Sequence, residues 1–217
     1  MSKLKSLSNS SNVAGLARLG IKGEVLGVSI NDLRALAKEL GVNQELALKL
    51  FAIGVREAKI LASYIADPDE FSSDLLDEWV VQLGSWEEVD QVSGLFLQTG
   101  LAREKIREWV RDEREFVRRT AFSMIAWISV RDKELLDSEF KEFLELIKKY
   151  STDERHYVRK AVDWALRSIG KRNLSLNKKA VAVAKELLAS GDKTATWIGK
   201  HALKELTSER VQDRLKK

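Results

Sequence analysis

The sequence predicts an all-α protein built from repeated pairs of helices. Leu, Ala, Lys and Glu dominate, and the single proline, Pro68, stands in an Asp67-Pro68-Asp69 turn. Glycines recur where helices would end. No segment alternates apolar and polar residues over the length of a strand, so no sheet is expected.

Start and stop signals divide the chain into helices. Ser29 with Asp32 resembles a capping box, and Gly41 ends that helix. Further starts are predicted at Asn43, at Ser72 or Ser73, and at Ser85, with Gly84 ending the helix before Ser85. We expect roughly eleven or twelve helices joined by short connections.

A four-residue pattern in the C-terminal half of the chain is repeated after about 41 residues. Phe116-Val117-Arg118-Arg119 is followed by Tyr157-Val158-Arg159-Lys160 and then by Trp197-Ile198-Gly199-Lys200. The apolar stripes behind the first two copies also correspond: Val117, Ala121, Met124 and Ile128, then Val158, Val162, Ala165 and Ile169. Helix pairs with this period are typical of HEAT-like repeats. We therefore expect a right-handed α-solenoid with a concave basic groove, forming a single domain over residues 1–217. The third copy fades after Ala202, as in a terminal capping repeat.

Positive charge is concentrated in the second half of the chain. The whole sequence carries 37 Lys+Arg and 33 Asp+Glu, but residues 1–98 hold 9 basic against 14 acidic residues, and residues 99–217 hold 28 against 19. The densest stretch, Arg155 to Lys179, has eight basic residues and one acid, Asp163. Such a face suits a polyanion such as nucleic acid, the alternative being an ordinary solvated basic surface.

Several classes of protein are disfavoured. With no Cys, disulfides and thiolate metal sites are excluded, and a cytoplasmic location is expected. His156 and His201 lie far apart and are expected to be surface or capping residues. There is no apolar run of transmembrane length and no signal-peptide pattern. We expect a monomer without metal or cofactor.

One tryptophan stands among cations. On the predicted helix from Arg155 to Gly170, Lys160, Trp164, Arg167 and Lys171 form a stripe roughly opposite the apolar stripe. Arg119 takes the place of Lys160 one repeat earlier. The stripe indicates a binding face; alternatively, Trp164 packs against a neighbouring repeat with the cations around its ring.

A second pair, Trp86 and Asp90, lies one helical turn apart on the flank of a helix. The spacing alone is only weak evidence that this pair is catalytic. Trp86 could fill a repeat interface, and Asp90 could stabilise the first turn of its helix through the helix dipole.

Together these residues resemble the DNA alkylation repair family, the AlkD-like alkylpurine DNA glycosylases built from HEAT-like repeats. The resemblance runs from about residue 20 to residue 206, and the segment from Tyr157 to Asn173 is its most specific part. The matching stretches are Leu26-Gly27-Val28-Ser29 with Leu33-Arg34; Leu50-Phe51 with Gly54, Glu57 and Ala58; Ser85-Trp86 with Val89-Asp90; Arg119-Thr120-Ala121-Phe122; Val158 to Arg167; Gly170 to Asn173; and Trp197-Ile198 with Ala202-Leu203 and Glu205-Leu206.

The resemblance implies an enzyme that hydrolyses the N-glycosidic bond of cationic N3- or N7-alkylated purines in duplex DNA. The implied catalytic residues are Trp86, Asp90 and Trp164. The carboxylate of Asp90 would oppose the charge of the oxocarbenium-like sugar and orient water, and the two indoles would flank that sugar. The expected DNA-binding residues are Arg119, Arg159, Lys160, Arg167, Lys171, Arg172 and Lys200.

Two features depart from this expectation. Glu87 and Glu88 place two further acids beside the implied site, and residues 1–19 have no counterpart, so they are expected to form a capping or poorly ordered segment. Relatives that share the fold and only bind DNA give a second hypothesis, a non-catalytic protein for damaged or branched DNA. A protein-interaction scaffold, the common use of HEAT repeats, is the third.

Overall fold

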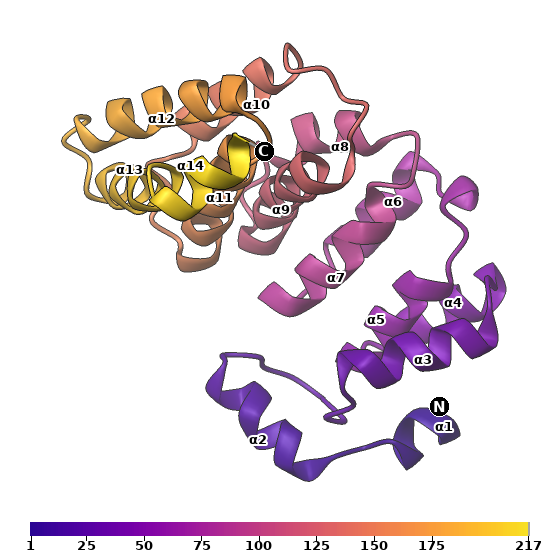
Figure 1. Cartoon of the computed structure of the whole chain (residues 1–217). Coiled ribbons are helices and arrows are strands. Elements are labelled where there is room, and N and C mark those ends of the chain that lie inside the picture. Colours follow the sequence, from indigo (N-terminus) through magenta and orange to yellow (C-terminus); the bar gives the residue numbers. More distant parts are fainter. Residues whose placement is uncertain (217) are drawn as a thin grey trace. The chain divides into compact units, whose positions relative to one another are not determined.

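The computed structural model describes residues 1–216 and contains, within them, fourteen α-helices, one short 3-10 helix and no strand (Figure 1). The chain forms two compact units, Met1–Lys105 and Ile106–Lys217. The all-α prediction is confirmed, and the helices outnumber the expected eleven or twelve. Nowhere in residues 1–216 is a helix long and apolar enough to cross a membrane.

The first unit begins with two short helices, and its later helices pack around α5. Its elements are α1 (Ser2–Ser6), α2 (Ser10–Arg18), α3 (Ile30–Leu40), α4 (Gln44–Phe51), α5 (Arg56–Ile65), η1 (Pro68–Glu70), α6 (Ser73–Val80) and α7 (Trp86–Phe96), and the division between the units falls within α8 (Ala102–Trp109). Helix α5 packs against α3 on one side and α7 on the other, and α4 covers α5. This packing buries nine of the ten residues of α5.

The predicted helix starts in this unit are confirmed. The side chains of Ser29, Asn43, Ser72 and Ser85 each accept a hydrogen bond from a backbone N–H in the first turn of the following helix. Gly41, with φ of 67°, ends α3. The prediction that Gly84 ends the helix before Ser85 is wrong. That helix, α6, already ends at Val80, and the N–H of Gly84 instead donates to the Glu88 carboxylate at 2.8 Å.

The segment 1–19 is helical, and polar backbone contacts hold α2 in place. No residue of α2 is buried. The N–H of Asn9 donates to the Leu26 carbonyl at 2.9 Å, and the Asn12 amide donates to the Gly27 carbonyl at 2.9 Å. Gly27 has φ of +74°, and a Cβ there would lie 2.1 Å from the Asn9 carbonyl oxygen, so only glycine allows this close approach.

The second unit repeats one helix pair. It contains α9 (Glu115–Arg131), α10 (Phe140–Lys149), α11 (His156–Gly170), α12 (Leu174–Leu188), α13 (Lys193–Leu206) and α14 (Glu209–Leu215). Helices α9, α11 and α13 pack in succession, while α10 and α12 pack on each other and on α11. This two-layer alternation is typical of stacked helix pairs.

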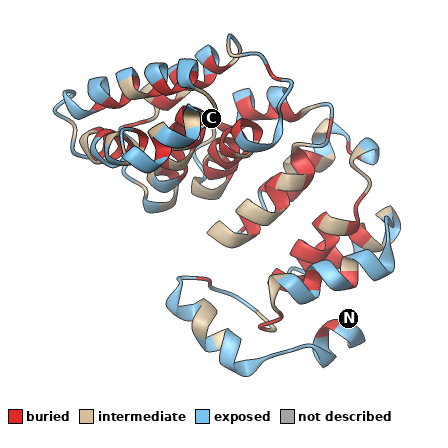
Figure 2. Cartoon of the chain, in the orientation of Figure 1, coloured by how far each residue is buried: buried red, intermediate tan, exposed pale blue. Residues whose placement is uncertain are grey.

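The two predicted apolar stripes form the core of this unit. Every residue of both stripes is buried, on α9 and on α11 (Figure 2). In the third copy Gly199 stands where the first two copies have Arg118 and Arg159. A Cβ at Gly199 would lie 2.5 Å from the carbonyl oxygen of Ala184 on α12, so the close packing of α12 on α13 accounts for this departure.

Candidate functional site

Trp86 and Asp90 lie on α7, one turn apart, and both are half-buried. Trp86 is the first residue of the helix, directly after the N-cap Ser85. Its indole N–H donates to the Leu19 carbonyl at 3.1 Å, which ties the ring to the end of α2. The indole is therefore oriented by a hydrogen bond as well as by packing.

The two acids next to Trp86 are bonded to cations from α5. Arg56 donates to the Glu87 carboxylate at 2.7 Å. Lys59 lies 3.3 Å from the Glu88 carboxylate, which also accepts the Gly84 N–H. Each of the two acids thus has a cationic partner within the fold, although Arg56 is shared with the buried Glu57, and this lessens the difficulty that two free acids beside a phosphate-binding face would cause.

Arg56 belongs to a buried ion network that fixes the loop before α3. Glu57 is fully buried and accepts hydrogen bonds from the backbone N–H of Leu26 at 2.9 Å and of Gly27 at 2.8 Å. Arg56, 3% exposed, donates to Glu57 at 2.8 Å as well as to Glu87. Burial opposes the charge of Arg56, but Glu87 and Glu57 outweigh it and raise the pKa of the guanidinium. Gly27 and Glu57, both in the stretches that carry the family resemblance, are therefore connected to α7 through Arg56 and Glu87.

Trp164 on α11 is half-buried and packs on the preceding repeat. Its ring meets that of Trp127 on α9 edge to face, with centroids 5.4 Å apart. The guanidinium of Arg131 lies over the Trp127 ring at 4.0 Å. This is the packing that the alternative interpretation expected, yet Trp164 also lines a hollow of about 530 Å³ at the end of α11.

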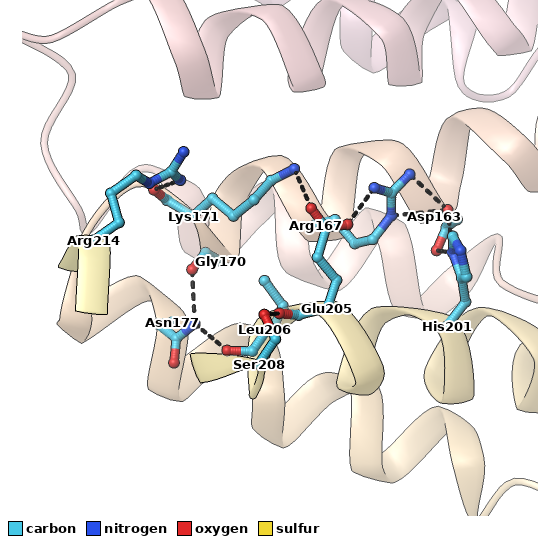
Figure 3. Close-up of polar contacts among 10 residues, drawn as sticks. All are labelled: Asp163, Arg167, Gly170, Lys171, Asn177, His201, Glu205, Leu206, Ser208 and Arg214. Carbon is cyan, nitrogen blue, oxygen red and sulfur yellow. Dashed lines mark hydrogen bonds and ion pairs between the residues drawn. The ribbon is translucent and has the colours of Figure 1, made fainter. Parts of the chain in front are cut away.

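Arg167 and Lys171, the two cations that follow Trp164 on this side of α11, are bridged by one acid from α13 (Figure 3). Glu205 on α13 accepts from Arg167 at 2.5 Å and from Lys171 at 2.9 Å. Arg167 also donates to the buried Asp163 at 3.0 Å, and the Nδ1 of His201 lies 2.9 Å from both oxygens of that carboxylate. Two of the three cations of the predicted basic stripe, Arg167 and Lys171, thus belong to an ion network that joins α11 to α13, whereas Lys160 is exposed.

The two cations shift the titration of Glu205. Burial alone would raise the pKa of this carboxyl, but hydrogen bonds from Lys171 and Arg167 lower it to about 2. Burial likewise opposes the charge of Arg167, and Asp163 with Glu205 nevertheless raises the pKa of its guanidinium. Glu205 and Arg167 are therefore both charged at neutral pH.

Two of the expected DNA-binding arginines hold backbone carbonyls. Arg119 is 5% exposed and donates to the Tyr157 carbonyl at 2.9 Å, which links α9 to α11. Arg172 donates to four carbonyls just at and beyond the end of α9, those of Ser129, Asp132, Lys133 and Leu135. Both side chains connect successive repeats in this structure.

The other expected DNA-binding residues lie nearer the surface. Lys160 and Lys200 are exposed, and Arg159 is half-buried. Arg159 and Lys160 place their charges over the Trp197 ring, at 4.6 and 5.0 Å from its centroid, and the His201 ring stacks on Trp197 at 5.2 Å. These α11 and α13 side chains form one aromatic and cationic cluster.

Sequence reasoning missed two cations. Lys133, between α9 and α10, and Arg214, on α14, line the same hollow as Trp164. The sequence signal was weak because they lie about 30 and 50 residues from Trp164 and outside the repeated tetrads. Since Trp86 and Asp90 belong to the first unit and Trp164 to the second, their meeting in one site stays a prediction.

Comparisons with known proteins identify the family. A family model described as DNA alkylation repair enzyme matches residues 1–206. A solved structure described as a new family of proteins related to the HEAT-like repeat DNA glycosylases, with affinity for branched DNA structures, is similar with a TM-score of 0.85 and 22% identity, covering 99% of this chain and 94% of its own. A designed armadillo repeat protein in complex with a (KR)4 peptide reaches only a TM-score of 0.37, at 18% identity, over 99% and 95% of the two chains. No curated protein matches. The structural likeness confirms the HEAT-like repeat fold, and the chain belongs to the DNA alkylation repair enzyme family.

Proposed function

We propose that the protein is a monomeric DNA repair glycosylase that hydrolyses the N-glycosidic bond of cationic N3- or N7-alkylated purines in duplex DNA, without metal or cofactor. The observation that carries the proposal is the pair Trp86 and Asp90 on one face of α7, both half-buried. Their shared helix face supports Asp90 as the carboxylate that acts beside the Trp86 indole. The activity on chromosomal DNA fits a cytoplasmic protein that binds the nucleoid.

The chemistry asks for charge stabilisation more than for acid catalysis. When the bond from C1′ to the purine nitrogen breaks, the electron pair leaves with a purine that already carries positive charge. The sugar becomes oxocarbenium-like, and the Asp90 carboxylate opposes that charge. Water then adds to C1′ and releases a proton, with Asp90 orienting the attacking oxygen. Trp86 and Trp164 flank the sugar through their ring faces.

The second unit supplies the phosphate contacts in this proposal. Lys160 and Lys200 are exposed on α11 and α13 and suit direct contacts. Arg159, Arg167 and Lys171 are half-buried and reach phosphates only if their present contacts rearrange. Arg119 and Arg172 act by positioning, since each connects two repeats through backbone carbonyls.

A second candidate function is favoured by one specific observation. The structural relative with a TM-score of 0.85 is described as having affinity for branched DNA. A protein of this fold that grips distorted or branched DNA without chemistry would use the same basic unit and leave Asp90 idle. The protein-interaction scaffold has no observation of its own in its favour.

Base release separates these functions. The wild-type protein is incubated with methylated duplex DNA, and the release of 7-methylguanine and 3-methyladenine is measured. Asp90→Asn is expected to slow release by about 10²–10³-fold with duplex affinity retained. Asp74→Asn is the control, because it makes the same change at an exposed acid on α6.

The outcomes point to different functions. Release at the spontaneous rate, with tight binding of a four-way junction, would establish the non-catalytic binder. Absence of both release and DNA affinity at about 0.1 M salt would support the scaffold.

A further inference from the structure

The hollow beside Trp164 has a composition that suits an anionic ligand. It has a volume of about 530 Å³ and is bounded by the ends of α9 and α11 and by α14. Four of its lining residues are cations, Lys133, Lys171, Arg172 and Arg214, and none is an acid. All of these residues lie in the second unit.

In the described part of the chain, three of the four cations form no ion pair. Lys171 is paired with Glu205. Among residues 1–216, no carboxylate pairs with the side chain of Lys133, Arg172 or Arg214. Arg172 donates to carbonyl groups, which carry no net charge, and Arg214 donates to the Lys171 carbonyl at 3.1 Å, as Figure 3 shows. The hollow is therefore a positive site held in place by hydrogen bonds to neutral groups.

The lining also offers an aromatic surface. Trp164 forms part of the wall, and its position is fixed by the Trp127 ring. The volume lies in the range of about 300–1,000 Å³ that small-ligand sites occupy. Proteins that bind single-stranded nucleic acid combine cations, which contact the phosphates, with aromatic side chains, on which the bases stack.

We propose that this hollow binds an unpaired nucleotide, with its phosphate at Lys133 and Arg214 and its base against the Trp164 indole. A nucleotide inside a duplex is paired and stacked, so the occupant comes from a strand end, a gap or a branch point. The proposal rests on the proposed function in taking the Trp164 side of the second unit as a DNA-binding surface. The hollow would add a second recognition site, which binds next to the lesion where a DNA strand ends, is interrupted or branches.

A titration with a mononucleotide tests the site without any DNA or chemistry. The full chain is labelled with ¹⁵N, and the Trp164 indole N–H resonance is assigned with Trp164→Phe. 2′-Deoxyadenosine 5′-monophosphate is titrated at low salt, in parallel with deoxyadenosine and with inorganic phosphate. The expected result is a saturable shift of the Trp164 resonance by the nucleotide, weakened about three- to tenfold by Lys133→Ala or Arg214→Ala. Lys178→Ala on α12, an exposed cation outside the hollow, should leave the affinity unchanged.

A second arm uses DNA that differs only in pairing. A duplex with a 5′-phosphorylated single-stranded overhang should bind more tightly than the blunt duplex, and Arg214→Ala should remove the difference. No nucleotide-dependent shift of Trp164, or equal affinity in Lys133→Ala, Arg214→Ala and wild type, would overturn the proposal. Inorganic phosphate that reproduces the whole effect would overturn the nucleotide assignment. A protein that binds the mononucleotide but releases no base would lose the proposed function and keep this site.

Discussion

Glu205→Gln should strengthen DNA binding while it weakens the fold. Glu205 is the carboxylate that bridges Arg167 and Lys171, at 2.5 and 2.9 Å. Glutamine keeps the shape of the side chain and one hydrogen-bond acceptor but removes the negative charge. Lys171 then loses its carboxylate partner, and Arg167 keeps only Asp163.

The cost in stability follows from the pKa of Glu205. A carboxyl whose pKa falls from 4.5 to about 2 on folding contributes at most roughly 3 kcal/mol at neutral pH. The Glu205 side chain is 22% exposed, and solvent screening reduces the expected loss to about 1–2 kcal/mol. Because the pKa is lowered in the folded state, the contribution is full above about pH 4.5 and disappears as the pH falls through about 2. Urea unfolding at pH 7 and pH 3 should therefore show a smaller difference between variant and wild type at pH 3.

The gain in DNA affinity follows from counterion release. Each additional phosphate contact steepens the dependence of log affinity on log salt by about 0.9. The freed Lys171 should therefore steepen it by about 1, and by about 2 if Arg167 also exchanges Asp163 for a phosphate. Fluorescence anisotropy with a labelled duplex, measured over a range of salt, gives this slope. Glu209→Gln is the matched control, since it removes the same charge at an exposed position on α14. An unchanged slope in Glu205→Gln, with the expected loss of stability, would refute the claim that Arg167 and Lys171 face DNA.

Three further substitutions test the supports of the site by urea unfolding. Arg56→Ala leaves the buried Glu57 without its cation and should destabilise the protein by about 3–5 kcal/mol; a loss below about 1 kcal/mol would contradict the role of the ion network. Arg172→Ala removes charged hydrogen bonds to carbonyls around the end of α9 and should cost about 2–3 kcal/mol, without rescue by Arg172→Lys, because one ammonium cannot span them all. Gly199→Ala places a Cβ 2.5 Å from the Ala184 carbonyl and should cost about 1–3 kcal/mol, whereas Gly100→Ala, with open space around it, should be nearly neutral.

The repeat architecture was predictable because it depends on local spacing. The stripe through Val117 and its equivalent through Val158 follow from helical periodicity, and both are buried as expected. Helix starts at Ser29 and Ser85 follow from side chains that bond their own first turn. The predicted helix end at Gly84 failed: α6 ends at Val80, and the Gly84 N–H donates to the Glu88 carboxylate in the first turn of α7.

The acidic partners of the predicted basic stripe could not be predicted from the sequence of its own helix. Arg167 and Lys171 meet Glu205, which lies 38 and 34 residues further along the chain. Only the stacking of α13 on α11 brings that acid to them, and a charge count along one helix cannot include it. The same reason applies to Arg172, whose four carbonyl partners lie about 37–43 residues earlier.

The sequence predicts the residue types of the candidate site, and the structure agrees with the local placement of some of them. Trp86 and Asp90 share a helix face, as their spacing required, and Trp164 is partly exposed next to cations. Its contact with Trp127 was expected only as the alternative interpretation. Lys133 and Arg214 were missed because each lies outside the repeated tetrads, in a connection and in a short terminal helix.

The rate of 7-methylguanine release from methylated duplex DNA tests the central claim most directly. We expect the wild-type protein to release the base well above the spontaneous rate and Asp90→Asn to lose most of this acceleration while binding the same DNA. Release by the wild-type protein at the spontaneous rate, or equal rates for the wild type and Asp90→Asn, would contradict that claim.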